Sequence, residues 1–176
     1  MLEMTLSASR FGNIREGNGD MPDMLVKLYQ LPDYEPEKKR MEASGVTVRR
    51  AIAPEKHVVV EWVREHFNAH WASECEAAFA NHPVTCMIAQ EGGKLIGFAC
   101  YEATCKNFFG PTGVHPDYRG KGVGRALLIA SLHQMAALGY GYAIIGGVGP
   151  ADFYAKTVGA IMIEDSKPGI YKNMLR

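Results

Sequence analysis

Apolar and polar positions in this chain recur with two periods, one of two residues, typical of strands, and one near 3.6, typical of helices. Short apolar runs bounded by Gly, Pro or charged residues predict the strands. Strands are expected at residues 24–31, 46–52, 84–90, 94–103, 108–114, 142–148, 160–164 and 170–174. Gly92 and Gly93 predict a hairpin between their flanking strands, and the last two strands are expected to pair with each other.

Helical periodicity separates several of these strands. Ser73 with Glu76 three residues later forms a capping-box pattern for a short helix, which Pro83 closes. Residues 123–138 are apolar around most of the helix circumference, which predicts burial against a sheet. The expected helices are 54–67, the short segment begun by Ser73, 123–138 and 151–158.

The order of these elements predicts the fold class. A strand, a buried helix and a second strand form a crossover, so 108–114 and 142–148 are expected to lie parallel. The chain is therefore predicted to be an α/β protein with a mixed, largely antiparallel sheet, a central parallel strand pair and flanking helices. Residues 46–176 would form the main domain, and residues 1–45 an N-terminal extension with an extra strand and helix.

Charge and composition exclude several partners. Lys plus Arg and Asp plus Glu each number 19 among 176 residues, so no overall field would attract nucleic acid or an anionic membrane. The basic run at residues 38–40 is flanked by Glu37 and Glu42, which favours a solvated helical face over a binding patch. The four cysteines form no Cys-x-x-Cys pair, and no signal peptide or run of roughly 20 apolar residues is present. A cytoplasmic protein is expected.

Residues 108–128, FFGPTGVHPDYRGKGVGRALL, carry the clearest chemistry in the chain. Glycines at 120, 122 and 124 stand where a helix exposes its first unpaired N–H groups, and bare backbone lets a ligand approach closely. Those N–H groups and the helix dipole attract anions. Three basic residues surround them: Arg119, Lys121 and Arg125. The stretch therefore predicts a pyrophosphate site.

The spacing of the glycines selects among phosphate-binding loops. A P-loop is excluded because His115 and Gly122 stand where its first glycine and its Ser or Thr are needed. A dinucleotide fingerprint is excluded because neither Gly120 nor Gly122 is followed by a glycine at the required position. The pattern that fits is Arg-x-x-Gly-x-Gly at residues 119–124, preceded by Val-x-Pro at 114–116. It closely resembles the acetyl-CoA motif of the GNAT superfamily of N-acetyltransferases.

This resemblance implies acetyl-CoA as the co-substrate. Backbone groups around Gly113 and Val114 would pair with the pantetheine arm where two parallel strands splay apart, and Gly110 and Gly113 would ease its approach. A backbone N–H near Val114 would polarise the thioester carbonyl. The coenzyme-binding residues implied in this way are Gly113, Val114, His115, Arg119, Gly120, Lys121, Gly122, Val123, Gly124 and Arg125.

The resemblance extends to residues 143–159, where Phe-Tyr-x-x-x-Gly recurs in the family. Tyr154 takes the position of a tyrosine that sits beside the coenzyme's sulfur and protonates it as it leaves. A phenol of pKa near 10 is a competent donor to a thiolate whose conjugate acid titrates near 8.5. Aromatic packing under the sheet is the alternative role. Ala160 departs from the family pattern, which often has an aromatic residue there.

The acceptor amine has to lose a proton, because a lysine-like amine of pKa about 10.4 is protonated at neutral pH. The family places its base variably, often as a Glu near the central strands. Glu102 is the nearest candidate in the sequence and Asp152 the next. For both, an exposed carboxylate at the end of an element is the alternative.

Other residue groups carry weaker signals. His66 and His70 lie four apart but lack the Glu and the third ligand of a zinc site, so no metal is expected. With Trp71 they fall in the connection between the first two helices, and in the GNAT family this connection lines the acceptor pocket. Cys100 and Cys105 show no partner for nucleophilic catalysis and are expected in the core.

The predicted function is transfer of an acetyl group from acetyl-CoA to the amine of a small molecule, by direct attack on the thioester. A protein or peptide amine is the alternative acceptor. A non-catalytic sensor that binds acyl-CoA is the alternative from another class. A homodimer is left open.

Overall fold

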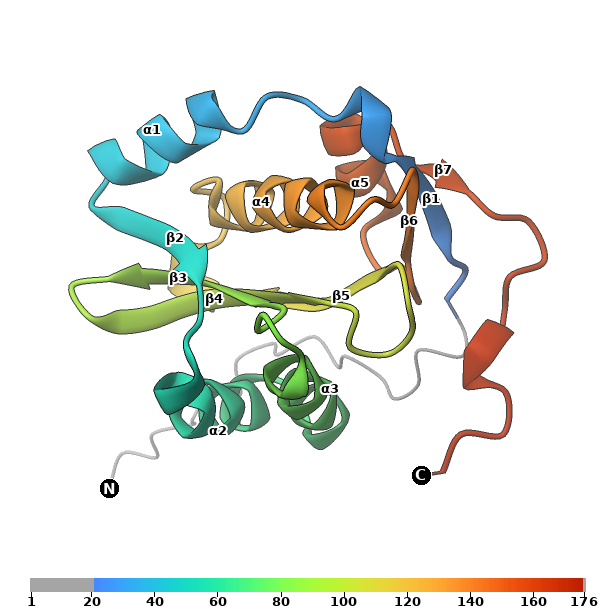
Figure 1. The fold of residues 1–176 in the computed structure, drawn as a ribbon, viewed down its shortest axis with the longest axis horizontal. Coiled ribbons are helices and arrows are strands. Elements are labelled where there is room, and N and C mark those ends of the chain that lie inside the picture. The colour runs from blue at the N-terminus through green and yellow to red at the C-terminus, as the bar shows by residue number, and fades with distance from the viewer. Residues whose placement is uncertain (1–20, 176) are drawn as a thin grey trace, which may run out of the picture.

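The computed structural model describes residues 21–175 and shows one seven-stranded sheet with helices on both faces (Figure 1). The first part of the predicted extension, residues 1–20, lies outside the described residues. β5 and β6 are parallel and every other neighbouring pair is antiparallel, which confirms the predicted mixed sheet. Across the sheet the strands are β2 (Val46–Arg50), β3 (Cys86–Glu91), β4 (Lys94–Tyr101), β5 (Phe108–Val114), β6 (Tyr142–Ile145), β1 (Met24–Lys27) and β7 (Ile161–Met162).

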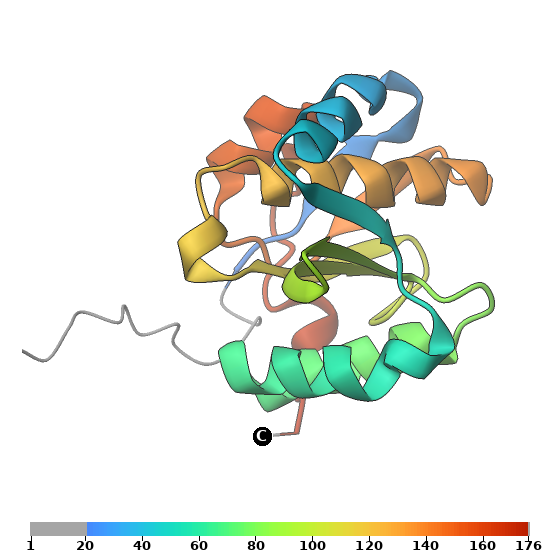
Figure 2. The same ribbon diagram turned by 90° about the vertical axis from the view of Figure 1, so that its left-hand side faces the viewer.

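The helices form a layer on each face of the sheet, as the two views together show (Figures 1 and 2). α4 lies on one face with α1 above it and α5 at one end, while α2 and α3 cover the opposite face. Their bounds are α1 (Glu35–Ala43), α2 (Lys56–His66), α3 (Ala69–Ala80), α4 (Val123–Ala137) and α5 (Ala151–Val158). Within residues 21–175, no helix combines the length and apolar character that crossing a membrane requires.

Each helical layer encloses its own hydrophobic core. Around α4, Leu127, Leu132 and Met135 are completely buried against the sheet, which confirms that this helix is packed on several sides. Between the sheet and the α2–α3 layer, Val63 and Phe98 are completely buried. A sheet covered on both faces needs apolar side chains pointing both ways, which explains the nearly continuous apolar runs in its central strands.

The predicted pairing of residues 160–164 with 170–174 is wrong. β7 pairs with β1, so that Met24 stands opposite Met162. Gly169–Tyr171 forms a 3-10 turn and adds no strand to the sheet. The sheet therefore inserts a segment from near the N-terminus between β6 and β7.

Burial explains why the N-terminal segment takes this position. Met24 and Val26 alternate along β1 and are buried, whereas Ile170 remains largely exposed. A strand that buries one apolar face gains more free energy from the position between β6 and β7 than a segment that would bury little apolar surface. The predicted strand 24–31 is correspondingly shorter, because Leu28–Gln30 turns away as a 3-10 helix.

The start of the second helix in the main domain also differs from the prediction. α3 begins at Ala69, not near Ser73. Asn68 has an extended backbone, and its side-chain oxygen accepts a hydrogen bond from the Trp71 N–H at 2.8 Å, which is a standard N-cap. Ser73 lies inside the helix and donates to the Ala69 carbonyl instead.

Candidate functional site

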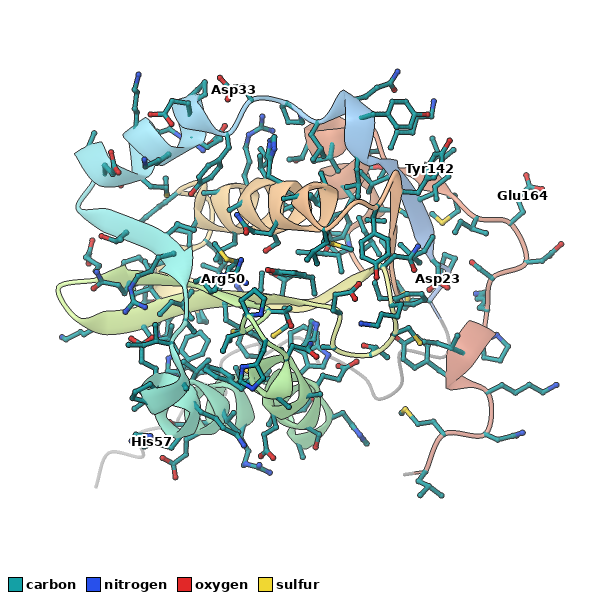
Figure 3. All side chains as sticks on the ribbon, in the orientation of Figure 1. Asp23, Asp33, Arg50, His57, Tyr142 and Glu164 are labelled. Atoms are coloured by element: carbon teal, nitrogen blue, oxygen red, sulfur yellow. The ribbon has the colours of Figure 1, made fainter. Side chains whose placement is uncertain are left out.

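The two parallel strands diverge after a short paired stretch. β5 and β6 pair only at Phe108 with Ile144 and at Phe109 with Ile145, and β5 then continues to Val114. β6 ends before Gly147, whose N–H donates to the Asp23 carboxylate at 2.8 Å (Asp23 is labelled in Figure 3). Within the described chain, one edge of residues 110–114 therefore has no strand partner. Such an edge offers backbone donors and acceptors to a ligand.

The connection from β5 to α4 forms the glycine-rich turn predicted from the sequence. Gly120 and Gly122 have φ angles of +74° and +85°, a conformation that favours glycine. Gly122 caps α4 without any side-chain hydrogen bond, and the first intrahelical bond runs from the Ala126 N–H to its carbonyl. The N–H groups of residues 123–125 consequently have no partner within the helix. They and the helix dipole favour an anion.

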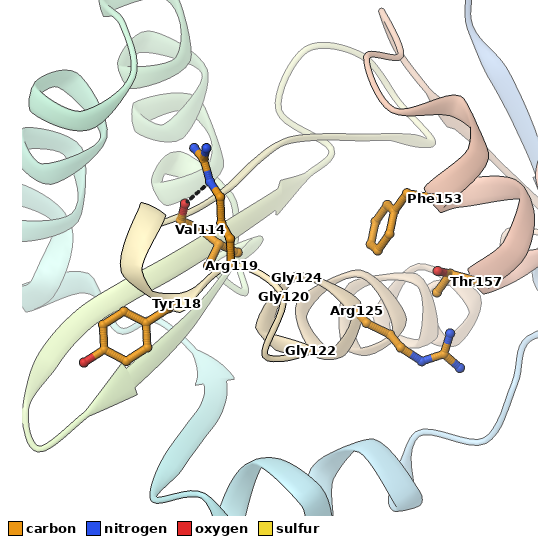
Figure 4. Close-up of a pocket in the computed structure, with 9 residues that line it drawn as sticks. All are labelled: Val114, Tyr118, Arg119, Gly120, Gly122, Gly124, Arg125, Phe153 and Thr157. Atoms are coloured by element: carbon orange, nitrogen blue, oxygen red, sulfur yellow. Dashed lines mark hydrogen bonds between the residues drawn. The ribbon is translucent and has the colours of Figure 1, made fainter. Parts of the chain in front are cut away.

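A cleft of about 410 Å³ opens beside this turn (Figure 4). Its far wall comes from α5, where Phe153 and Thr157 lie four residues apart and so share one helix face. Sequence reasoning missed both, although their spacing beside Tyr154 could have indicated a common face. The lining residues are Val114, Tyr118, Arg119, Gly120, Gly122, Gly124, Arg125, Phe153 and Thr157.

Four of the residues implied by the family resemblance do not line the cleft. The Val123 side chain is buried in the core, so only its backbone faces the turn. The Lys121 ammonium stands over the Tyr118 ring, 4.9 Å from the centroid. The other two residues outside the lining are Gly113 and His115.

Gly113 and His115 contact a group of aromatic side chains from α2, α3 and the loop between them. A Cβ on Gly113 would lie 2.7 Å from Phe67 Cε1, so the ring covers the bare face that was expected to ease the coenzyme's approach. Phe67 also lies 5.1 Å from the Trp71 ring, and His66 lies 5.3 Å from the His115 ring. Of the residues weighed for an acceptor wall, His66 and Trp71 thus lie close to the end of β5.

Tyr154 lies at the base of the gap between the diverging strands. Its ring meets Phe109 edge-on at 6.5 Å, and Phe109 belongs to the last β5–β6 pair. The residue is 6% exposed, and burial raises the pKa of its phenol to about 12. The hydroxyl therefore stays protonated across the neutral range and can act as a proton donor.

The two carboxylates considered as bases are engaged elsewhere. The Glu102 side chain is only 4% exposed; its carboxylate accepts bonds from the Asn107 N–H and the Tyr140 hydroxyl and lies 3.2 Å from the Lys106 ammonium. It therefore holds the β4–β5 connection together. Asp152 is 95% exposed in α5, and its carboxylate lies 4.0 Å from the Lys156 ammonium. Neither lines the cleft.

The cysteines are placed differently from one another. Cys100 is fully buried, as expected, whereas Cys105 is only partly buried, so the expectation is wrong for that residue. Cys86 stands directly opposite Cys100, and with Cys75 of α3 the three sulfurs lie within 4.8 Å of one another. The sheet register sets Cys86 opposite Cys100, and the packing of α3 against the sheet adds Cys75, so the separation of the three along the chain hides their proximity.

Arg119 gives a first test of the cleft. Arg119 lines the cleft, and its guanidinium donates to the Val114 carbonyl at 3.2 Å, as Figure 4 shows. If it contacts phosphate, Arg119→Ala should raise the KM for acetyl-CoA about tenfold, the value of one charge-assisted hydrogen bond, and leave kcat nearly unchanged. Lys121→Ala should have a smaller effect, because this ammonium faces Tyr118. A large fall in kcat with an unchanged KM would assign Arg119 to the chemistry.

The fold and the cleft define a class: α/β proteins with a glycine-rich helix terminus beside diverging parallel strands. Comparison with protein families makes this specific. The model of the acetyltransferase (GNAT) family matches residues 48–159, and the chain belongs to this family. No curated protein matches the chain.

Solved structures with a similar fold include several acetyltransferases. The GCN5-related glucosamine N-acetyltransferase region of a fungal multi-domain β-N-acetylglucosaminidase superposes with a TM-score of 0.67 and 16% identity, over 81% of this chain and 20% of that one. A GCN5-related N-acetyltransferase from Sphaerobacter thermophilus gives a TM-score of 0.63 and 20% identity, over 81% and 48%. One from Kribbella flavida gives 0.52 and 15%, over 81% and 54%. The chain spans about half or less of the first two proteins, and at these identities the likeness shows the fold.

Proposed function

We propose that the protein is an acetyl-CoA-dependent N-acetyltransferase that acts on the amine of a small molecule. One observation carries this proposal: the glycine-rich start of α4 and Val114, at the end of the unpaired edge of β5, line a single cleft. The helix terminus suits the pyrophosphate of the coenzyme. The strand edge suits its amide-containing pantetheine arm, which can pair as another strand would.

The proposed reaction is a direct transfer. A backbone N–H near Val114 polarises the thioester carbonyl, and the neutral amine attacks the carbonyl carbon. The C–S bond then breaks, the thiolate takes a proton from Tyr154 as it leaves, and the Tyr154 phenolate regains a proton from water. The proton lost by the amine passes to water, since Glu102 is held by other contacts and neither Glu102 nor Asp152 lines the cleft.

A small acceptor is favoured by the aromatic group beside β5. Phe67 and Trp71 lie near Gly113, and His66 lies near His115, so a compact wall of rings borders the strand that would carry the thioester. Such a wall suits a small amine with an apolar or cationic body. A protein or peptide acceptor is the alternative outcome of an acceptor screen.

Coenzyme binding should raise the melting temperature, because a ligand that binds only the folded state stabilises it by mass action. With acetyl-CoA at a hundred times its Kd, the expected rise is about 5–10 °C for a chain of this size. The measurement is a thermal melt with and without acetyl-CoA. If the melting temperature does not shift at about a millimolar acetyl-CoA, the proposed coenzyme site is wrong.

An assay of thiol release separates catalysis from binding alone. Purified protein is incubated with acetyl-CoA and separate pools of small amines, amino acids, polyamines and peptides. Release with a small-molecule pool supports the proposal, and release only with peptides supports the alternative acceptor. A thermal shift without release from any pool would indicate a non-catalytic acyl-CoA sensor.

A further inference from the structure

Helix α1 lies next to the start of α4, although it precedes the region matched by the family model. Its Arg40 points at the glycine-rich turn. A Cβ built on Gly122 would lie 2.7 Å from Arg40 Cζ, and the two terminal nitrogens lie as close. The guanidinium therefore packs directly against the backbone of a glycine that lines the cleft.

One carboxylate links this arginine to a second one. Glu37 Oε1 accepts from Arg125 Nε at 2.6 Å, and Glu37 Oε2 pairs with the Arg40 guanidinium. The Glu37 side chain is 13% exposed. Burial alone would raise the pKa of this carboxyl, but hydrogen bonds from both arginines outweigh it and lower the pKa. Two cations share one anion, which leaves a net positive charge at the helix terminus.

We propose that Arg40 is a phosphate ligand of the coenzyme, so that a helix outside the matched family region completes the phosphate site at the start of α4. This rests on the proposed function. A guanidinium presents five N–H donors in a planar fork, and the bond to Glu37 uses only part of them. The remaining donors lie beside a turn whose own backbone N–H groups are unpaired within the helix. Phosphate oxygens accept from both kinds of donor.

A purely structural role for Arg40 makes a different prediction. If Arg40 only fastens α1 to α4, its removal lowers the stability of the ligand-free protein and leaves coenzyme affinity as it is. If Arg40 binds phosphate, its removal weakens affinity and makes binding less dependent on salt, because fewer ions are displaced. The two roles therefore separate in a binding titration.

The experiment measures Kd for CoA and for dephospho-CoA at two salt concentrations, with wild type, Arg40→Ala, Arg40→Lys and Lys39→Ala. Lys39 is an exposed cation on the same helix and serves as the matched control. Arg40→Ala should bind CoA about tenfold more weakly, the loss of one charge-assisted hydrogen bond, while Lys39→Ala binds as wild type. Arg40→Lys should fall between them, since it keeps the charge and loses the fork.

Dephospho-CoA identifies the phosphate. If Arg40→Ala binds both ligands equally more weakly, Arg40 contacts the pyrophosphate. If it binds only CoA more weakly, Arg40 contacts the 3′-phosphate. Both results support the proposal. If Arg40→Ala binds CoA as tightly as Lys39→Ala does, Arg40 is not a phosphate ligand, while the proposed function stands. Wild-type protein that binds neither ligand overturns both.

Discussion

Replacing Tyr154 with Phe is expected to lower turnover by about a hundredfold to ten-thousandfold, the usual contribution of a general acid. The change keeps the ring that packs edge-on against Phe109 and removes only the proton. Folding and coenzyme binding should therefore survive. The measurement is kcat with a working amine acceptor, under conditions where chemistry limits the rate.

The pH dependence follows from the raised pKa of Tyr154. Because burial holds this pKa at about 12, the donor remains protonated in wild type throughout the neutral and mildly alkaline range. In the Phe variant the thiolate leaves without a donor, which becomes easier as pH rises above the thiol pKa of about 8.5. The difference in kcat between Tyr154→Phe and wild type should therefore become smaller toward high pH.

Tyr118→Phe is the matched control for this experiment. Tyr118 lines the cleft, which Tyr154 does not, and its hydroxyl donates to Glu91 at 2.6 Å. Loss of that hydroxyl should leave kcat close to wild type. If Tyr154→Phe retains more than about half the wild-type rate at neutral pH, another group protonates the thiolate, and Tyr154 is a packing residue.

Gly124→Glu is expected to weaken acetyl-CoA binding by about a hundredfold or more. A Cβ on Gly124 would lie 3.5 Å from Val114 Cγ2, an ordinary contact, so the backbone accepts the side chain. The carboxylate would then enter the cleft and repel phosphate, and one like charge at about 4 Å costs roughly 4 kcal/mol near a protein surface. The measurement is the Kd for acetyl-CoA.

The stability of this variant provides an internal check. Glu favours a helix more than Gly does, and a negative charge in the first turn suits the helix dipole. The ligand-free protein should therefore melt at or above the wild-type temperature while losing its response to coenzyme. Gly141→Glu is the control, because a Cβ there meets nothing within 4 Å and the site lies beyond the other end of α4. A normal response to coenzyme in Gly124→Glu would place the phosphates elsewhere.

Local chemistry explains what could be predicted from the sequence. The turn at residues 119–124 depends on glycine conformations, and Gly120 and Gly122 do adopt positive φ angles. Helix α5 has the predicted limits, Ala151–Val158. The parallel order of β5 and β6 follows from a buried helix between two strands. In each case the interactions that decide the structure lie within one continuous segment, the longest of which is residues 108–145.

The sequence by itself determined the class of fold and the position of the glycine-rich turn, because periodicity and glycine spacing act over short distances. Tertiary structure decided which segments meet. β1 rather than residues 170–174 pairs with β7, because segments from the whole chain compete for this position and β1 buries Met24 and Val26 there. Glu37 reaches Arg125, and Phe67 covers Gly113, only because folding brings distant elements together. Such contacts leave no periodic signal, since each depends on the packing of all the elements around it.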